Sequence, residues 1–157
     1  MGFGLRLTLK VIGFCFLIII IQTAIVDDFF GLQLNLPYIT LISFASILGI
    51  FENVVASLFF CSMISLLSYD SHMPWIYLII AIIANKINPE NIADKLIVCI
   101  VFCLLFTPIL EMFNPNSSSY FYRVLSASLI NVISVIPMYF LVNFLFSKTN
   151  TLRFSYD

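Results

Sequence analysis

Residues 37–75 read PYITLISFASILGI FEN VVASLFFCSMISLLSY DSHMPW, and this stretch decides the fold. Two apolar segments flank the short group Phe51-Glu52-Asn53, and a polar break follows at residues 70–73. As a helix, each segment of about 15–16 residues rises ~24 Å, slightly less than the ~30 Å hydrocarbon core of a bilayer. The stretch therefore predicts two short transmembrane helices, at residues 37–51 and 54–69, joined by a tight acidic turn at residues 51–53.

The composition of the chain also indicates a membrane protein. Of its 157 residues, 62% are hydrophobic and only 10% are charged, and the mean hydropathy is +1.10. Soluble domains carry about 25% charged residues, so this chain is too apolar to cover a surface that faces water. The net charge of −1 offers no basic field for nucleic acid. We expect a single integral membrane domain over residues 1–157, surrounded by membrane lipid.

Four further apolar segments complete an all-α, polytopic transmembrane helical bundle of about six short helices. The fourth segment is the shortest, and it starts at Pro74. The most polar stretch, KINPENIADK, precedes the fifth, and NPNSSSYFYR precedes the sixth. The predicted spans are residues 9–26, 37–51, 54–69, 74–85, 96–113 and 124–146.

The basic residues predict how such a bundle is oriented. With six spans both termini lie on one side, and cytoplasmic loops are enriched in Lys and Arg. With the termini in the cytoplasm, Arg123 alone falls outside, while six of the seven basic residues fall inside: Arg6, Lys10, Lys86, Lys95, Lys148 and Arg153. The charge pattern therefore predicts cytoplasmic termini.

Small and polar side chains indicate where the helices meet. Lipid gives no hydrophobic drive between helices, so association relies on close packing and interhelical hydrogen bonds. Ser57, Cys61 and Ser65 recur every four residues and form one stripe on the third span. The sixth span carries Asn131, a polar group deep in an apolar segment. We expect these four residues to form a helix-packing or partner-binding face.

Few groups are suited to catalysis or to metal binding, so we expect no enzyme activity, no cofactor and no metal site. The only histidine, His72, stands next to Asp70 and Ser71 in a predicted outer loop, whereas catalytic triads are spatial rather than sequential constellations. Cys99 and Cys103 share a helix face, which favours packing because buried free cysteines are common.

Two acidic residues complete the candidates for chemistry. Acidic groups inside a membrane are functional candidates. Glu52 and Glu111, however, fall at predicted span ends, where we expect their carboxylates to be solvated.

The order of features resembles one family, the rod shape-determining protein MreD. After the first span, Pro37-Tyr38-Ile39-Thr40-Leu41 is similar to the start of the family's second span. Residues 62–69, SMISLLSY, precede Pro74 as a similar run does in the family, with Ser65 and Tyr69 standing where the family has Asp and Gly. In the last helix, Asn131 precedes Pro137 by six residues, as in the family's Asn-then-Pro pattern.

The resemblance implies a non-enzymatic adaptor in the bacterial inner membrane. Such a protein binds the bitopic periplasmic scaffold MreC and associates with the cell-wall synthases of the elongation machinery. A membrane-embedded adaptor acts by presenting helix faces to its partners, which is consistent with short loops and scarce polar groups.

The alternative is a transport subunit, similar to the substrate-binding S component of energy-coupling vitamin transporters. That class has a similar size and helix count, a polar pocket that opens outward, and a small-residue stripe in its first span. The first span here lacks a four-residue small repeat. The residues that would line such a pocket are Gln22, Asp70, His72, Trp75, Asn116 and Tyr120.

Overall fold

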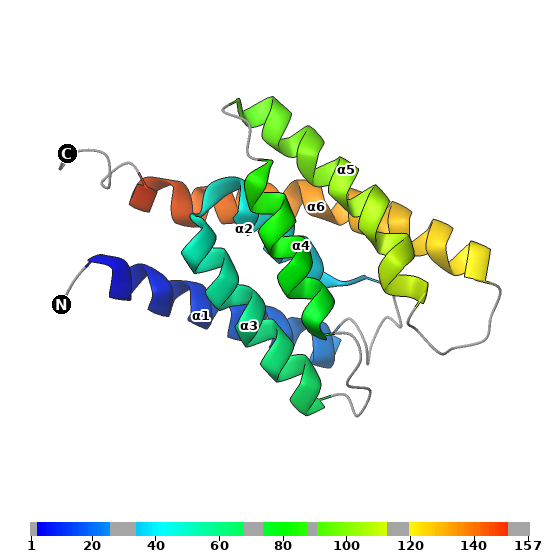
Figure 1. The fold of residues 1–157 in the computed structure, drawn as a ribbon, viewed down its shortest axis with the longest axis horizontal. Coiled ribbons are helices and arrows are strands. Elements are labelled where there is room, and N and C mark those ends of the chain that lie inside the picture. The colour runs from blue at the N-terminus through cyan, green and yellow to red at the C-terminus, as the bar shows by residue number, and fades with distance from the viewer. Residues whose placement is uncertain (1–2, 26–33, 68–73, 88–90, 113–119, 151–157) are drawn as a thin grey trace.

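A computed structural model describes residues 3–25, 34–67, 74–87, 91–112 and 120–150. Over these ranges the chain is all-α, as the hydropathy pattern predicts, and contains no strand. The six helices are α1 (Phe3–Ile21), α2 (Leu36–Ile47), α3 (Ile50–Leu67), α4 (Pro74–Lys86), α5 (Ile92–Met112) and α6 (Tyr120–Asn150). The start of α1 and the end of α6 lie at the same end of the bundle (Figure 1).

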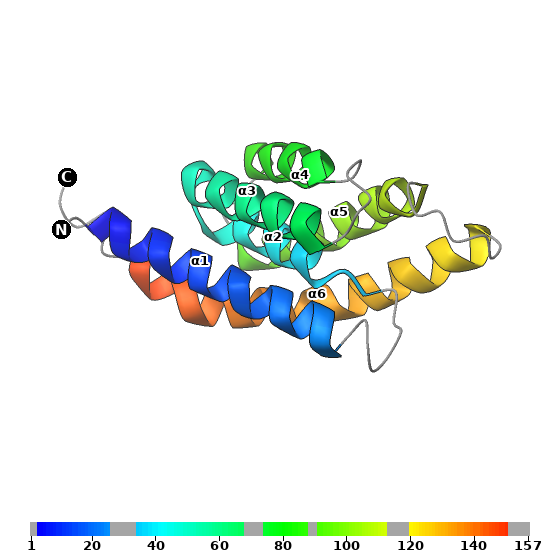
Figure 2. The ribbon, with the colours of Figure 1, turned by 90° about the horizontal axis from the view of Figure 1, so that it is seen from below.

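The short helix α2 is the centre of the bundle. It packs against each of the other five helices, and all twelve of its residues are buried. Figure 2 shows α4 on one side of α2, with α1 and α6 along the opposite side. Because every residue of α2 is buried inside the bundle, all sides of this helix contact protein.

Within the described residues, four helices are long and apolar enough to cross a membrane, namely α1, α3, α5 and α6. The other two are shorter, since α2 has 12 residues and α4 has 13, or about 18 Å and 20 Å of rise. The prediction of six helices is confirmed. The predicted second span, residues 37–51, is too long, because α2 ends at Ile47.

The predicted turn at residues 51–53 is wrong. The chain turns at Leu48 and Gly49, where the backbone of Leu48 is extended (φ −98°, ψ 164°). The helix α3 then begins at Ile50 and includes Glu52 in its first turn. Glycine disfavours the helix interior, and a carboxylate near a helix N-terminus is stabilised by the helix dipole, so Gly49 interrupts the helix and Glu52 continues it.

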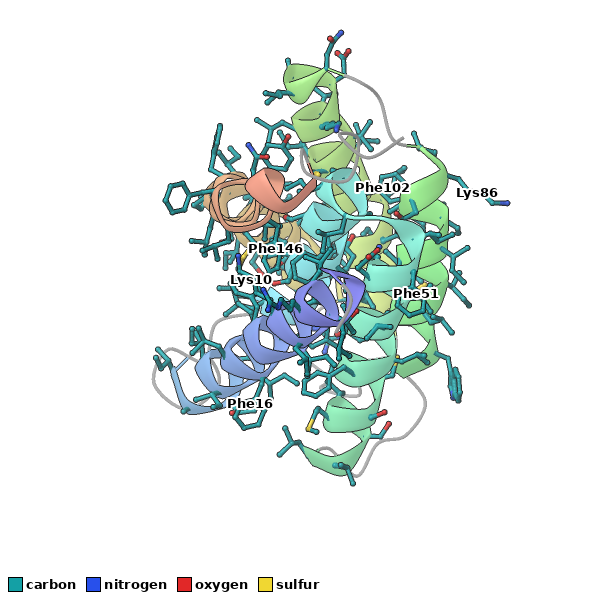
Figure 3. The ribbon with its side chains drawn as sticks, turned by 90° about the vertical axis from the view of Figure 1, so that its left-hand side faces the viewer. Lys10, Phe16, Phe51, Lys86, Phe102 and Phe146 are labelled. Carbon is teal, nitrogen blue, oxygen red and sulfur yellow. The ribbon has the colours of Figure 1, made fainter. Side chains whose placement is uncertain are left out.

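Three phenylalanine rings join α1, α2 and α6 near the end where the chain starts. The ring centroids of Phe14, Phe44 and Phe146 lie 5.4–5.8 Å apart in all three pairs. Lys10 Nζ donates a hydrogen bond to the carbonyl oxygen of Leu145 (2.6 Å) and lies 5.1 Å from the centroid of the Phe146 ring. Figure 3 shows Lys10 and Phe146 together at this end of the bundle.

The two phenylalanines near the end of α6 provide a test of this packing. Phe146 is completely buried, whereas Phe144 is 74% exposed. We expect Phe146→Ala to lower the free energy of unfolding by about 3 kcal/mol, because the ring loses its contacts and leaves a cavity. The matched Phe144→Ala change should cost well under 1 kcal/mol, since lipid or detergent replaces the ring. Unfolding by SDS in mixed micelles measures both, and equal losses would contradict the packing described here.

Candidate functional site

The main polar cluster of the bundle forms at the start of α2. Asn35 is the N-cap of this helix, and its Oδ1 accepts a hydrogen bond from the backbone N–H of Tyr38 (3.1 Å). Pro37 stands in the first turn, where its missing N–H needs no partner. The local sequence Asn35-Leu36-Pro37 therefore starts the helix at a defined residue.

Two other helices bind the same asparagine. The backbone N–H of Asn35 donates to Asn131 Oδ1 of α6 (3.1 Å), and Asn35 Nδ2 donates to the hydroxyl oxygen of Tyr77 of α4 (2.7 Å). Asn131 is 2% exposed and Tyr77 is 5% exposed. Asn35 itself is half-buried and both bonds are part-buried, so the loss of one partner leaves a polar group with reduced access to water, which is costly.

The cluster continues into α5. Asn131 Nδ2 donates to Thr107 Oγ1 (3.3 Å), and that hydroxyl donates to the backbone carbonyl of Cys103 (2.6 Å). The Tyr38 hydroxyl donates to the carbonyl oxygen of Phe102 (2.7 Å). The start of α2 is thereby linked to α5 by two separate hydrogen-bonded connections.

Gln22 supplies the link to α1. It follows the last α-helical residue of α1, in a wider π-type turn at residues 22–25. Its Nε2 donates to the carbonyl oxygen of Leu34 (2.9 Å), and its Oε1 accepts from the backbone N–H of Leu36 (2.9 Å). One amide side chain thus binds two backbone groups that lie on either side of the helix cap.

The cluster consists of Gln22, Asn35, Tyr38, Tyr77, Thr107 and Asn131, which we call the α2 cap cluster. Amide and hydroxyl groups of these kinds hold neighbouring segments by neutral hydrogen bonds. These side chains form hydrogen bonds with one another and with the backbone. The hydrogen bonds fix the positions of α1, α2, α4, α5 and α6.

A second polar group lies between α3 and α4. Asn53 Nδ2 donates to the carbonyl oxygen of Ala81 (3.3 Å), which also accepts from Asn85 Nδ2 (3.0 Å). Glu52 is 2% exposed, so the expectation of a solvated carboxylate at this position is wrong. The cause is the earlier turn at Leu48 and Gly49, which places Glu52 on the first turn of α3 instead of in a loop.

The predicted stripe on α3 divides into two parts. Ser57 is completely buried and Cys61 is 8% exposed, whereas Ser65 is exposed. Ser57 Oγ donates to the carbonyl oxygen of Val54 (2.8 Å) within its own helix. Ser57 and Cys61 are thus packing residues inside the bundle, as is Asn131, and Ser65 alone of the four lies on the outer surface.

The cysteine pair of α5 is also part of the packing. Cys99 and Cys103 are completely buried, and Cys99 Sγ lies 3.1 Å from Ser46 Oγ of α2. Within the described ranges, the His, Cys, Asp and Glu side chains form no group of three that could hold a metal ion.

The remaining sequence candidates do not come together in the described structure. Trp75 and Tyr120 are exposed (65% and 45%), and the Tyr120 hydroxyl donates to the carbonyl oxygen of Pro108 (3.0 Å). Glu111 lies in the last turn of α5, but its side chain is outside the described part of the molecule. Asp70, Ser71, His72 and Asn116 lie outside the described residues.

Sequence reasoning missed four members of the cap cluster, Asn35, Tyr38, Tyr77 and Thr107. Asn35 carries a recognisable signal, because an asparagine two residues before a proline is typical of a helix start. Tyr77 and Thr107 carry none, since each is one polar residue in an apolar helix whose partner lies on another helix.

Comparison of the chain with protein-family models, curated proteins and solved structures gave no match. The fold and the cap cluster define a class, a polytopic helical membrane protein whose buried polar side chains join its helices.

The two asparagines of α6 test the cap cluster. We expect Asn131→Leu to lower the free energy of unfolding by about 1–2 kcal/mol, because it removes the partners of the Asn35 N–H and of Thr107. Asn143→Leu is the matched control, since Asn143 is only half-buried on the same helix. SDS unfolding in mixed micelles measures both variants, and an Asn131→Leu protein as stable as the control would argue against the cluster.

Proposed function

We propose that this protein is a non-enzymatic adaptor of the bacterial cell-elongation machinery, located in the inner membrane. In this role it binds an MreC-like bitopic scaffold and links it to the cell-wall synthases. One observation carries the proposal: the hydrogen bond between the Asn35 N–H and Asn131 Oδ1. It joins two of the segments on which the resemblance to the MreD family rests, the helix start at Pro37 and the Asn131-to-Pro137 pattern of the last helix.

The hydrogen-bond partners of the polar side chains also support an adaptor function. The α2 cap cluster and the Asn53 group bond to one another and to the backbone, so they stabilise one arrangement of helices. The outer faces are apolar, with exposed side chains such as Leu66, Leu129 and Phe144. A rigid bundle with apolar outer faces is suited to holding the transmembrane helix of a partner by close packing.

The proposed orientation places the start of α1 and the end of α6 in the cytoplasm. The distribution of basic residues supports this orientation, because Lys10 lies in the first half of α1, Lys86 at the end of α4 and Lys95 near the start of α5. Arg123 lies near the start of α6, at the opposite end of that helix from its last turn.

Reporter fusions test this orientation. We expect green fluorescent protein fused after residue 157 to fluoresce, and alkaline phosphatase at the same position to be inactive, because both report a cytoplasmic end. The control is the same pair of reporters fused after residue 117, between α5 and α6, where the result should be reversed. An active phosphatase at the C-terminus would contradict the orientation.

Affinity purification from the native host tests the function. We expect the tagged protein, extracted in mild detergent, to recover a single-span protein with a periplasmic coiled coil, together with cell-wall synthases. A second multi-pass protein of the same host, carrying the same tag, is the control for non-specific recovery. Depletion of the protein should convert rod-shaped cells into rounded ones.

Other outcomes would point to the transport subunit instead. Recovery of paired ATPases with a second membrane subunit, or of a tightly held small molecule, would overturn the adaptor proposal.

A further inference from the structure

The helix α4 is shorter than the hydrocarbon core of a bilayer is thick. It runs from Pro74 to Lys86, which is 13 residues, or about 20 Å along its axis. The hydrocarbon core of a bilayer is about 30 Å thick. A short central helix such as α2 causes no mismatch, because it is buried in protein. The question is therefore whether α4 is in contact with lipid.

One face of α4 is exposed along its whole length. We call this surface the α4 face; its residues are Trp75 (65% exposed), Ile79 (55%), Ile82 (37%), Ile83 (38%) and Lys86, which is also exposed. Their spacing of four, seven, eight and eleven residues from Trp75 places them on one side of a helix. The opposite side, which includes Tyr77, Ile80 and Ala84, is buried.

The position of α4 in the bundle agrees with this exposure. It lies on the outside, on the side of α2 away from α1 and α6 (Figure 2). Lys86 points away from the bundle (Figure 3).

Two hydrogen bonds from other parts of the bundle, one buried and one part-buried, hold the central turns of α4 in place. Near its start, the Tyr77 hydroxyl accepts from Asn35 Nδ2 (2.7 Å). One turn further along, the carbonyl oxygen of Ala81 accepts from Asn53 Nδ2 (3.3 Å). Sliding the helix along its axis would stretch both of these bonds, whereas a lipid bilayer deforms at a cost of fractions of a kcal/mol per Å.

The ends of the α4 face carry residues that favour the membrane interface. Tryptophan is enriched at the level of the lipid headgroups, and lysine extends its charged end toward them. Trp75 and Lys86 are eleven residues apart, or about 16 Å along a helix. By contrast, exposed apolar side chains on α6 extend from Phe121 to Phe144, or about 35 Å.

We propose that the bilayer is thinned along the α4 face and that this face binds short-chain phospholipids in preference to long-chain ones. The two sides of the bundle thus contact lipid of different thickness. This inference does not depend on the adaptor function, since it rests on the length, exposure and fixed position of α4.

Tryptophan fluorescence measures the surroundings of the α4 face directly, because Trp75 is the only tryptophan of the chain. The protein is reconstituted into vesicles that mix dimyristoleoyl and dioleoyl phosphatidylcholine, with one of the two lipids brominated across its double bonds to quench tryptophan fluorescence. Repeating the series with the other lipid brominated gives the relative binding of the two lipids next to Trp75. We expect at least about a threefold preference for the short-chain lipid.

The matched control moves the tryptophan to the long helix. In the double variant Trp75→Phe and Phe121→Trp, the indole lies at the start of α6, where Phe121 is 72% exposed. We expect no preference for the short-chain lipid there. Equal ratios at the two positions would overturn the inference. So would a Trp75 that neither brominated lipid quenches, because the α4 face would then be covered by protein.

Discussion

The first backbone N–H groups of a helix have no partner within the helix, and at the start of α2 they are bonded by the side chain of its own N-cap residue and by side chains from other helices. Asn35 caps the helix and binds Tyr77, Asn131 binds the Asn35 N–H, and Gln22 binds the backbone at Leu34 and Leu36. Unpaired backbone groups cost several kcal/mol in hydrocarbon. The position of α2 therefore requires α1, α4 and α6 to be in place around it.

This dependence explains how a 12-residue helix can be the centre of the bundle. A segment too short to cross the hydrocarbon core is unfavourable when it is surrounded by lipid, but α2 contacts only protein in the described structure. Close packing in two regions completes its surroundings, with the ring of Phe44 against Phe14 and Phe146 and Ser46 against Cys99. Small side chains at such contacts allow the helix backbones to approach closely.

The sequence predicts the number and type of helices because each is an apolar run that ends at polar or turn-forming residues. It misplaces the turn between α2 and α3, because a Glu52-Asn53 pair in an apolar stretch is expected to need water. In the structure the first turn of α3 accepts Glu52, and Asn53 bonds to the Ala81 carbonyl of α4. These partners follow from the tertiary arrangement, which local sequence does not contain.

The candidate site, like the fold, was predictable from the sequence only in part. Asn131 is recognisable as a deep polar residue in an apolar helix, and Gln22 by its place at the end of the first span. The helical spacing of Ser57, Cys61 and Ser65 is confirmed by α3. The spacing alone does not predict, however, that Ser65 is exposed while the other two residues are buried. Thr107 and Tyr77 acquire their importance from partners 24 and 42 residues away in the chain.

The hydrogen bond from Asn35 to Asn131 also has a consequence for biosynthesis. The two residues are 96 positions apart, so at typical elongation rates the ribosome takes about 5 to 20 seconds to make the second after the first. During that interval α2 lacks one of its partners and is too short to span the bilayer alone. The central helix is therefore fully enclosed only after α6, the last helix of the chain, has been made and inserted.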